Sequence, residues 1–133
     1  REKRGLAYDV SAFYPTRFGP SQFVAYIGTA PENAQVGFDG LVAEVERLRE
    51  ISLTATELQA SKNKLLGQYA LGKQTNADLA QLFGWYTIID LGIEFDDQFQ
   101  AAVNQITPDQ IQAAAQRYFQ TPYVIMVGPA RET

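Results

Sequence analysis

The chain has 133 residues, of which 46% are hydrophobic and 20% are charged; this is ordinary composition for one globular domain and excludes disordered and collagen-like classes. Its 15 acidic residues outnumber 11 basic ones, and the net charge of −4 makes nucleic acid an unfavourable partner. Cysteine and histidine are both absent, which excludes disulfides, Ser-His-Asp catalysis and zinc sites built from histidine or thiolate.

Residues 5–28 predict two strands joined as an antiparallel hairpin. The connecting loop at 15–21 is rich in Pro and Gly, which interrupt regular structure. On both sides of this loop, side chains alternate with the period of two that is typical of strands. One face of the first strand is expected to carry Leu6, Tyr8, Val10, Ala12 and Tyr14.

The segment 28–33 predicts the start of a helix, because it places Pro and Glu where a first helical turn favours them. A stripe of apolar residues then recurs at helical spacing: Phe38, Leu41, Val42, Val45 and Leu48. We expect this stripe to pack on Leu6, Tyr8 or their strand neighbours. Glu46 and Arg49 lie on the other face and are expected in solvent.

Four more helices are predicted further along the chain. Thr54 and Glu57 form a capping box that begins one of them, and residues 107–110 form a second box that includes a proline. Between these two starts, a break at 72–76 and an acidic turn at 90–97 separate two further helical stripes.

Residues 123–127 are apolar and predict a short closing strand, so the expected order is β-β-α-α-α-α-α-β in one domain covering 1–133. Clustered strands and clustered helices predict an α+β fold, with helices packed on one face of an antiparallel sheet. Three strands are few beside the usual ~4–6, and the chain starts abruptly at Arg1. We therefore expect a fragment that is incomplete at its N-terminus. No apolar run approaches ~18 residues, so a membrane is not expected as a partner.

Three other patterns do not indicate sites. Residues 67–73 match G-x-x-x-x-G-K, but Gln74 follows where a phosphate loop needs Ser or Thr, and we expect the end of a helix there. Four acids lack calcium-loop spacing and are expected to form a solvated helix start: Asp90, Glu94, Asp96 and Asp97. Three aromatic residues at helical spacing are expected in the core: Phe83, Trp85 and Tyr86.

The N-terminal segment contains the candidate binding residues. Gly5 after the basic stretch 1–4 is typical of a helix C-terminus, so Arg1 would end a helix and Tyr8 would lie in the following strand. A guanidinium and a phenol could then converge near one sheet edge, where they suit recognition of a carbonyl oxygen or a peptide backbone. Chemistry alone favours the alternative, in which the basic residues complement a helix dipole and the tyrosine packs.

The same segment, Arg1-Glu2-Lys3-Arg4-Gly5-Leu6-Ala7-Tyr8, resembles the R-E-x-x-G-L-A-Y sequence of the pitrilysin (insulinase-type) zinc peptidases. That family includes the mitochondrial processing peptidases. Further stretches resemble the family in order along nearly the whole chain, namely 28–33, 53–63, 71–76 and 124–129. Two features depart from it: Asp9 stands where Ser is common, and upstream elements of the domain are missing.

The resemblance implies a clamshell of homologous α+β halves, one of which carries zinc on H-x-x-E-H plus a distant Glu. The facing half supplies an Arg and a Tyr to the substrate at the spacing of Arg1 and Tyr8. Without His, this chain resembles that zinc-free C-terminal half.

The implied function is hydrolysis of peptide bonds together with a zinc-bearing partner half, on the same chain or a separate subunit. Tyr8 is the implied catalytic residue, bonding the substrate carbonyl or oxyanion, and Arg1 is the implied substrate-binding residue. The chain itself would hold no metal or other cofactor and would not be catalytic alone.

Two other classes of function stay open. A non-catalytic structural subunit of the same fold, similar to the core subunits of respiratory cytochrome complexes, would not need the pair formed by Arg1 and Tyr8. A free-standing α+β domain that binds a small ligand is disfavoured by the absence of a glycine-rich ligand turn. The sequence leaves the peptide specificity and the compartment undetermined.

Overall fold

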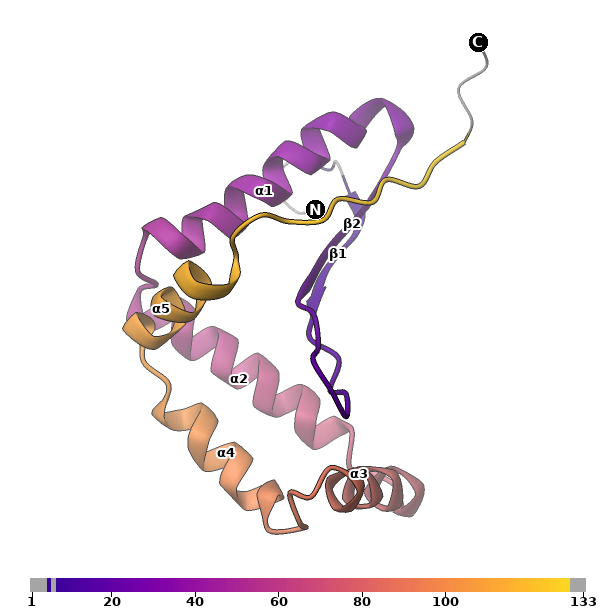
Figure 1. Ribbon diagram of the computed structural model, residues 1–133, viewed down its shortest axis with the longest axis vertical. Coiled ribbons are helices and arrows are strands. Elements are labelled where there is room, and N and C mark those ends of the chain that lie inside the picture. Colours follow the sequence, from indigo (N-terminus) through magenta and orange to yellow (C-terminus); the bar gives the residue numbers. More distant parts are fainter. Residues whose placement is uncertain (1–4, 6, 130–133) are drawn as a thin grey trace. The chain divides into compact units, whose positions relative to one another are not determined.

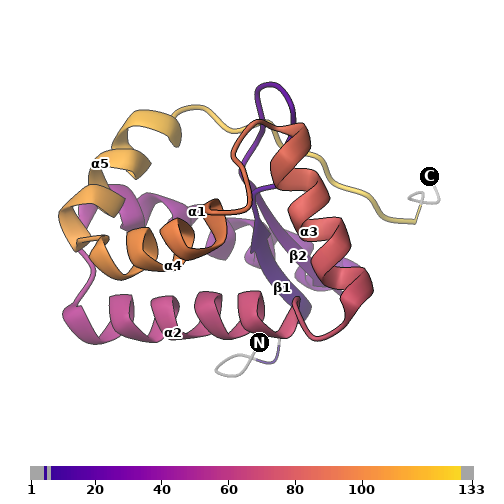
Figure 2. The ribbon, with the colours of Figure 1, turned by 90° about the horizontal axis from the view of Figure 1, so that it is seen from below.

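The structure is a computed structural model that describes residue 5 and residues 7–129. The chain divides into two compact units. The first unit comprises Arg1–Ile51 with Ala114–Thr133, and the second comprises Ser52–Ala113. Each unit has its own set of elements, which Figures 1 and 2 show from two directions.

The first unit contains the expected hairpin, formed by β1 (Ala7–Phe13) and β2 (Val24–Thr29). The two strands are antiparallel and make up a two-stranded sheet. The loop between them is tightened by a hydrogen bond from the Ser21 hydroxyl to the Pro15 carbonyl. The sequence prediction of a hairpin around this loop is therefore confirmed.

A β-bulge at Tyr8 changes the face of the hairpin on which the Tyr8 side chain lies. Ala7 pairs with Thr29 and Asp9 pairs with Gly28, so two residues of β1, Tyr8 and Asp9, stand against one residue of β2. Ala7 is buried, whereas Tyr8 is 74% exposed. The alternation expected from the sequence, which placed Tyr8 on the packed face, is wrong here because an extra residue shifts the period of two.

The helix α1 (Ala34–Glu50), which follows the short 3-10 turn η1 (Pro31–Asn33), packs against β2 (Figure 1). The contact is close at Gly37, which is buried. A Cβ at this position would lie 3.3 Å from Cδ1 of Ile27 and 3.5 Å from Cγ2 of Thr29. Ile27 and Thr29 therefore face α1, and glycine at position 37 allows the helix to approach the strand.

The apolar stripe of α1 is its less exposed face, as expected, while Glu46 is exposed. Arg49 is partly buried rather than solvated, and the Gln116 side-chain amide donates a 3.0 Å hydrogen bond to its carbonyl oxygen. The stripe was expected to pack on Leu6, Tyr8 or their strand neighbours, and α1 contacts β2, the strand that pairs with β1. Leu6 lies outside the described residues.

The strand expected at 123–127 does not form, and that prediction is wrong. Across residues 5 and 7–129, the only sheet is the β1–β2 pair, and the segment has no ladder partner. Its side chains are largely exposed, with Tyr123 at 102% and Val127 at 94%. An apolar, β-branched sequence becomes a strand only when a neighbouring edge accepts its backbone hydrogen bonds.

The second unit is helical, with α2 (Ala55–Leu71), α3 (Asn76–Ile88) and α4 (Phe95–Gln105), and α5 (Pro108–Tyr118) begins in it. Gly72 caps α2, so the G-x-x-x-x-G-K match lies at a helix end, as predicted. No helix within residues 5 and 7–129 combines the length and apolar character needed to cross a membrane.

Local hydrogen bonds begin these helices where the sequence places capping boxes. Thr54 and Glu57 bond reciprocally before α2, and Thr107 does the same with Gln110 before α5. A third box, formed by Thr75 and Asp78, begins α3 at a place that the sequence analysis treated only as a break. Strands and helices together confirm the α+β class.

Candidate functional site

Tyr8, the predicted catalytic residue, lies in the bulge of β1 with its side chain 74% exposed. Its neighbour Ala7 is buried and pairs with Thr29, which faces α1. Tyr8 therefore lies on the opposite face of the hairpin, and its hydroxyl makes no hydrogen bond with the described part of the chain. A bulge is a common means of redirecting a side chain near a functional site.

Arg1, the predicted substrate-binding residue, lies outside the described residues. Gly5, which follows the basic stretch, has a φ of 62°. This is a left-handed conformation that glycine adopts readily, and the helix expected before it lies outside the described residues.

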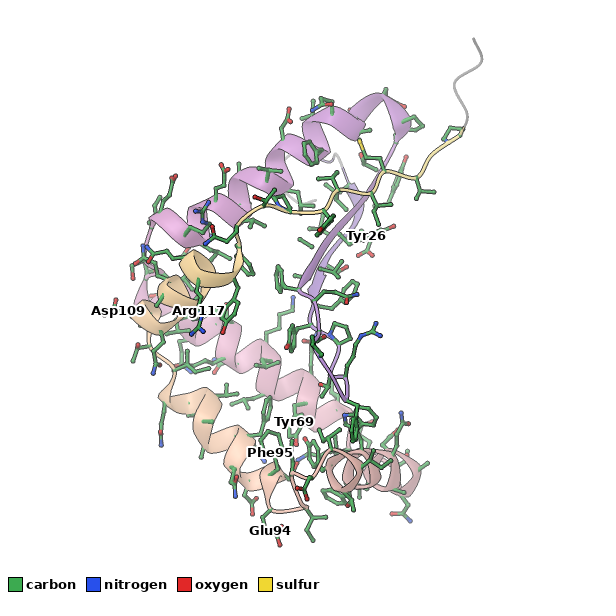
Figure 3. All side chains as sticks on the ribbon, viewed as in Figure 1. Tyr26, Tyr69, Glu94, Phe95, Asp109 and Arg117 are labelled. Atoms are coloured by element: carbon green, nitrogen blue, oxygen red, sulfur yellow. The ribbon has the colours of Figure 1, made fainter. Side chains whose placement is uncertain are left out.

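The face of the hairpin that carries Tyr8 holds a second tyrosine that the sequence analysis missed. Tyr26 of β2 is 48% exposed, and Figure 3 shows it on the side of the hairpin away from α1. Its ring lies over Gly28, where a Cβ would be 3.1 Å from the Tyr26 hydroxyl. A glycine two residues after a tyrosine in a strand is the sequence signal that could have indicated this arrangement.

The second unit contains a polar cluster of four side chains: Tyr69 of α2, Lys73 of the turn that follows α2, Tyr86 of α3 and Asp96 of α4. Lys73 Nζ donates to both carboxylate oxygens of Asp96, at 2.8 and 2.9 Å. The Tyr69 hydroxyl also donates to Asp96. Because Tyr69 has one proton to give, Tyr86 is the donor in the 2.6 Å bond between the two hydroxyls.

Aromatic rings surround this cluster and shape its electrostatics. The Tyr69 ring lies 4.6 Å from that of Phe99, and Lys73 Nζ is 4.4 Å from the Tyr69 ring centre. Burial, followed by the bonds to Asp96 and Tyr86, raises the pKa of Tyr69 far above its ordinary value. The bond from Lys73, followed by that from Tyr69, lowers the pKa of Asp96.

The cluster therefore joins three helices through groups that satisfy one another, which favours a structural role. Asp96 was expected in solvent; instead its side chain is 19% exposed and paired with Lys73. Asp97 is exposed as expected.

The sequence predicted three aromatic residues in the core. Tyr86 is only 6% exposed, so the prediction is confirmed for this residue. Phe83 and Trp85 are only partly buried.

The residues of this chain do not fit a zinc ion. The sequence has neither histidine nor cysteine, which are the principal ligands of zinc in proteins. Over the described ranges, no three side chains of the kinds that ligate metals gather into a group that could hold an ion. No chemical step of this chain is therefore assigned to a metal bound by its own side chains.

Sequence comparison relates the chain to peptidases. Residues 1–65, just under half of the chain, match the family described as Peptidase M16 inactive domain. Over 133 residues the chain is 26% identical to an uncharacterized zinc protease of Streptomyces coelicolor. This alignment covers 99% of the chain but 29% of the relative, so the chain corresponds to less than a third of that protein.

Two solved structures share the fold. A peptidase M16 inactive domain from Pseudomonas fluorescens superposes with a TM-score of 0.73 at 24% identity, covering 89% of this chain and 28% of that one. A protease from Helicobacter pylori superposes with a TM-score of 0.74 at 20% identity, covering 90% and 29%. Sequence and fold together confirm the resemblance to the zinc-free, C-terminal type of domain of pitrilysin-type (M16) peptidases.

Proposed function

We propose that this pitrilysin-type domain is the substrate-facing half of a zinc-dependent peptidase, acting with a homologous half that carries H-x-x-E-H. The match to an inactive M16 domain supports this role, as does the similarity to a protein named as a zinc protease. The poor fit of this chain to zinc supports a metal that is held by the partner half. That half supplies metal-assisted attack of water on a peptide bond.

Tyr8 carries the chemistry that we assign to this chain. Its hydroxyl donates a hydrogen bond to the carbonyl oxygen of the peptide bond to be cleaved. As negative charge develops on that oxygen, the bond strengthens, so it stabilises the transition state more than the substrate. The observation that carries this assignment is a 74% exposed phenol with no partner in the described part of the chain.

The remaining contacts bind the substrate. Arg1 binds the backbone or an acidic group of the peptide, or orients Tyr8, an assignment that rests on its spacing from Tyr8 in the sequence. Each strand of the hairpin has an outer edge without a ladder partner among the described residues. An extended peptide can add to such an edge as a further strand, through backbone hydrogen bonds.

The test is Tyr8→Phe in the peptidase assembled from this chain and its zinc-bearing half. The change removes one hydroxyl and keeps the ring, so we expect kcat to fall by roughly ten- to thousandfold. The melting temperature should stay within about a degree, since an exposed hydroxyl without a partner adds little to stability. In the same assay, Arg1→Ala should chiefly raise KM.

Tyr14→Phe is the matched control, because Tyr14 is 64% exposed and lies just beyond β1. Its kcat should equal that of the parent. Full turnover by the Tyr8→Phe enzyme would instead favour the alternative, a structural subunit of the same fold.

A further inference from the structure

Tyr26 and Tyr8 lie on the same face of the hairpin. Ile27 and Thr29 face α1, as their distances to a Cβ at Gly37 show. Residues at alternate positions of a strand point to opposite faces, so Tyr26 and Gly28 face away from α1. Tyr8 also faces away, because its neighbour Ala7 is buried on the α1 side.

The two phenols also lie near the same end of that face. The Tyr26 side chain extends along β2 toward Gly28, with its hydroxyl 3.1 Å and its Cε1 3.6 Å from the position of a Gly28 Cβ. Gly28 is the register partner of Asp9, and Asp9 directly follows Tyr8. Directly paired residues of antiparallel strands are about 5 Å apart. The Tyr26 hydroxyl is thereby brought close to the bulge that carries Tyr8.

We propose that Tyr26 is a second substrate-binding residue, whose hydroxyl donates to a backbone carbonyl of the peptide two residues along from the one that Tyr8 bonds. This inference rests on the proposed function of Tyr8. Tyr26 is 48% exposed, and its hydroxyl has no hydrogen-bond partner among residues 5 and 7–129. In an extended peptide, carbonyls that point the same way recur about every 7 Å, a spacing that suits two donors on one short hairpin.

Gly28 affects the position of the Tyr26 side chain. Its φ lies outside the left-handed range, so the backbone conformation does not require glycine. The space above Gly28 favours glycine, because a methyl group would meet the Tyr26 hydroxyl at 3.1 Å and the tyrosine side chain would have to shift. Glycine at this position thus lets the Tyr26 side chain extend over the residue that pairs with Asp9.

Two changes test the inference in the peptidase assembled from the full chain and its zinc-bearing half. Tyr26→Phe removes the hydroxyl, and Gly28→Ala keeps the hydroxyl but displaces it. Each should raise KM about three- to tenfold and leave kcat within about twofold, because one hydrogen bond to bound peptide is lost. The dissociation constant of a peptide probe with a reduced, uncleavable bond at the scissile position should rise by the same factor. Tyr14→Phe should change neither quantity.

Unchanged probe affinity and KM in Tyr26→Phe would overturn the inference. If Gly28→Ala does not fold, as judged by circular dichroism, Tyr26→Phe decides the outcome alone. Tyr8→Phe, measured in parallel, separates the two proposals. A loss of kcat in Tyr8→Phe with full affinity in Tyr26→Phe contradicts only the inference on Tyr26. Full kcat in Tyr8→Phe with weakened probe binding in Tyr26→Phe contradicts only the catalytic role of Tyr8 and supports Tyr26 as a peptide contact.

Discussion

The two units of the chain use tyrosine in opposite ways. In the helical unit, Tyr86 is 6% exposed and donates to Tyr69, which in turn donates to Asp96. In the hairpin, Tyr8 is 74% exposed and Tyr26 is 48% exposed. Neither of these two hydroxyls is bonded to any described residue. One unit directs its phenols at its own helices, while the other presents them to solvent.

This difference separates the tyrosine hydroxyls that stabilise the fold from those that are available to a ligand. A buried hydroxyl that completes a network stabilises the fold, and its removal leaves its partners without a hydrogen bond in a poorly hydrated place. An exposed hydroxyl is equally well bonded by water in the folded and unfolded chain, so its removal costs little stability. It therefore remains available to a ligand, and the two regions should respond to the same type of substitution in opposite assays.

The largest effect on stability is expected for Asp96→Ala. The change leaves Lys73 and Tyr69 without their acceptor, and both side chains of the ion pair are less than a fifth exposed, at 18% and 19%. Breaking a fully buried pair costs about 3–5 kcal/mol; for this partly solvated one we expect a loss of about 2–3 kcal/mol in the free energy of unfolding. Urea denaturation measures it.

Asp97→Ala is the matched control for that experiment. Asp97 is the next residue in the first turn of α4, but it is exposed. Its removal should cost about 0.5 kcal/mol or less, through a weaker interaction with the helix dipole. Equal losses for the two variants would mean that the cluster contributes nothing beyond the charge at the helix start.

Tyr69→Phe tests the comparison directly. It removes the hydroxyl that donates to Asp96 and accepts from Tyr86, and we expect a loss of about 1–2 kcal/mol in the free energy of unfolding. The same change at Tyr8 or Tyr26 should cost less than about 0.5 kcal/mol. Similar costs in both units would show that exposure does not separate the two groups of tyrosines.

The smallest expected effect is a change with pH in the contribution of Asp96 to stability. Because the pKa of Asp96 is lowered in the folded chain, its contribution to stability is present above about pH 4, the unfolded value, and is lost as the pH falls through the lower folded pKa. Thermal melts between pH 7 and pH 2 should show the advantage of the parent over Asp96→Asn shrinking at the acid end. A constant difference over that range would contradict the assignment.

Tyr69 makes a corresponding contribution at alkaline pH. Its pKa is raised in the folded chain, so the stability that its bonds supply is present below about pH 10 and declines above it, where the unfolded chain ionises first.

Local features were predictable because neighbouring residues determine them. The capping boxes at Thr54 and Thr107 are bonds between residues three apart, and both form as predicted. The hairpin follows from alternation around a loop rich in Pro and Gly. The composition likewise excludes histidine- and thiolate-based zinc sites, because the chain contains neither histidine nor cysteine.

The site was predicted only in part. Tyr8 was proposed as a site residue because its segment resembles a family sequence, and its exposure depends on a bulge that alternation cannot reveal. Tyr26 was missed although the glycine two residues after it was an available signal, because its nearness to Tyr8 follows only from the pairing of β2 with β1. The expected strand at 123–127 failed for a related reason, since a strand depends on an edge that lies elsewhere in the sheet.

The sequence by itself determined where helices and turns begin and which metal chemistry the chain lacks, because these depend on residue type and on contacts a few positions apart. Only the tertiary structure decided which phenols are buried. Asp96 lies 23 residues from Lys73 and 27 from Tyr69, and their bonds require the start of α4 to pack against the end of α2. The exposure of Tyr8 depends on the register of β1 against β2. Packing and register join residues that are distant in the chain, so no local pattern specifies them.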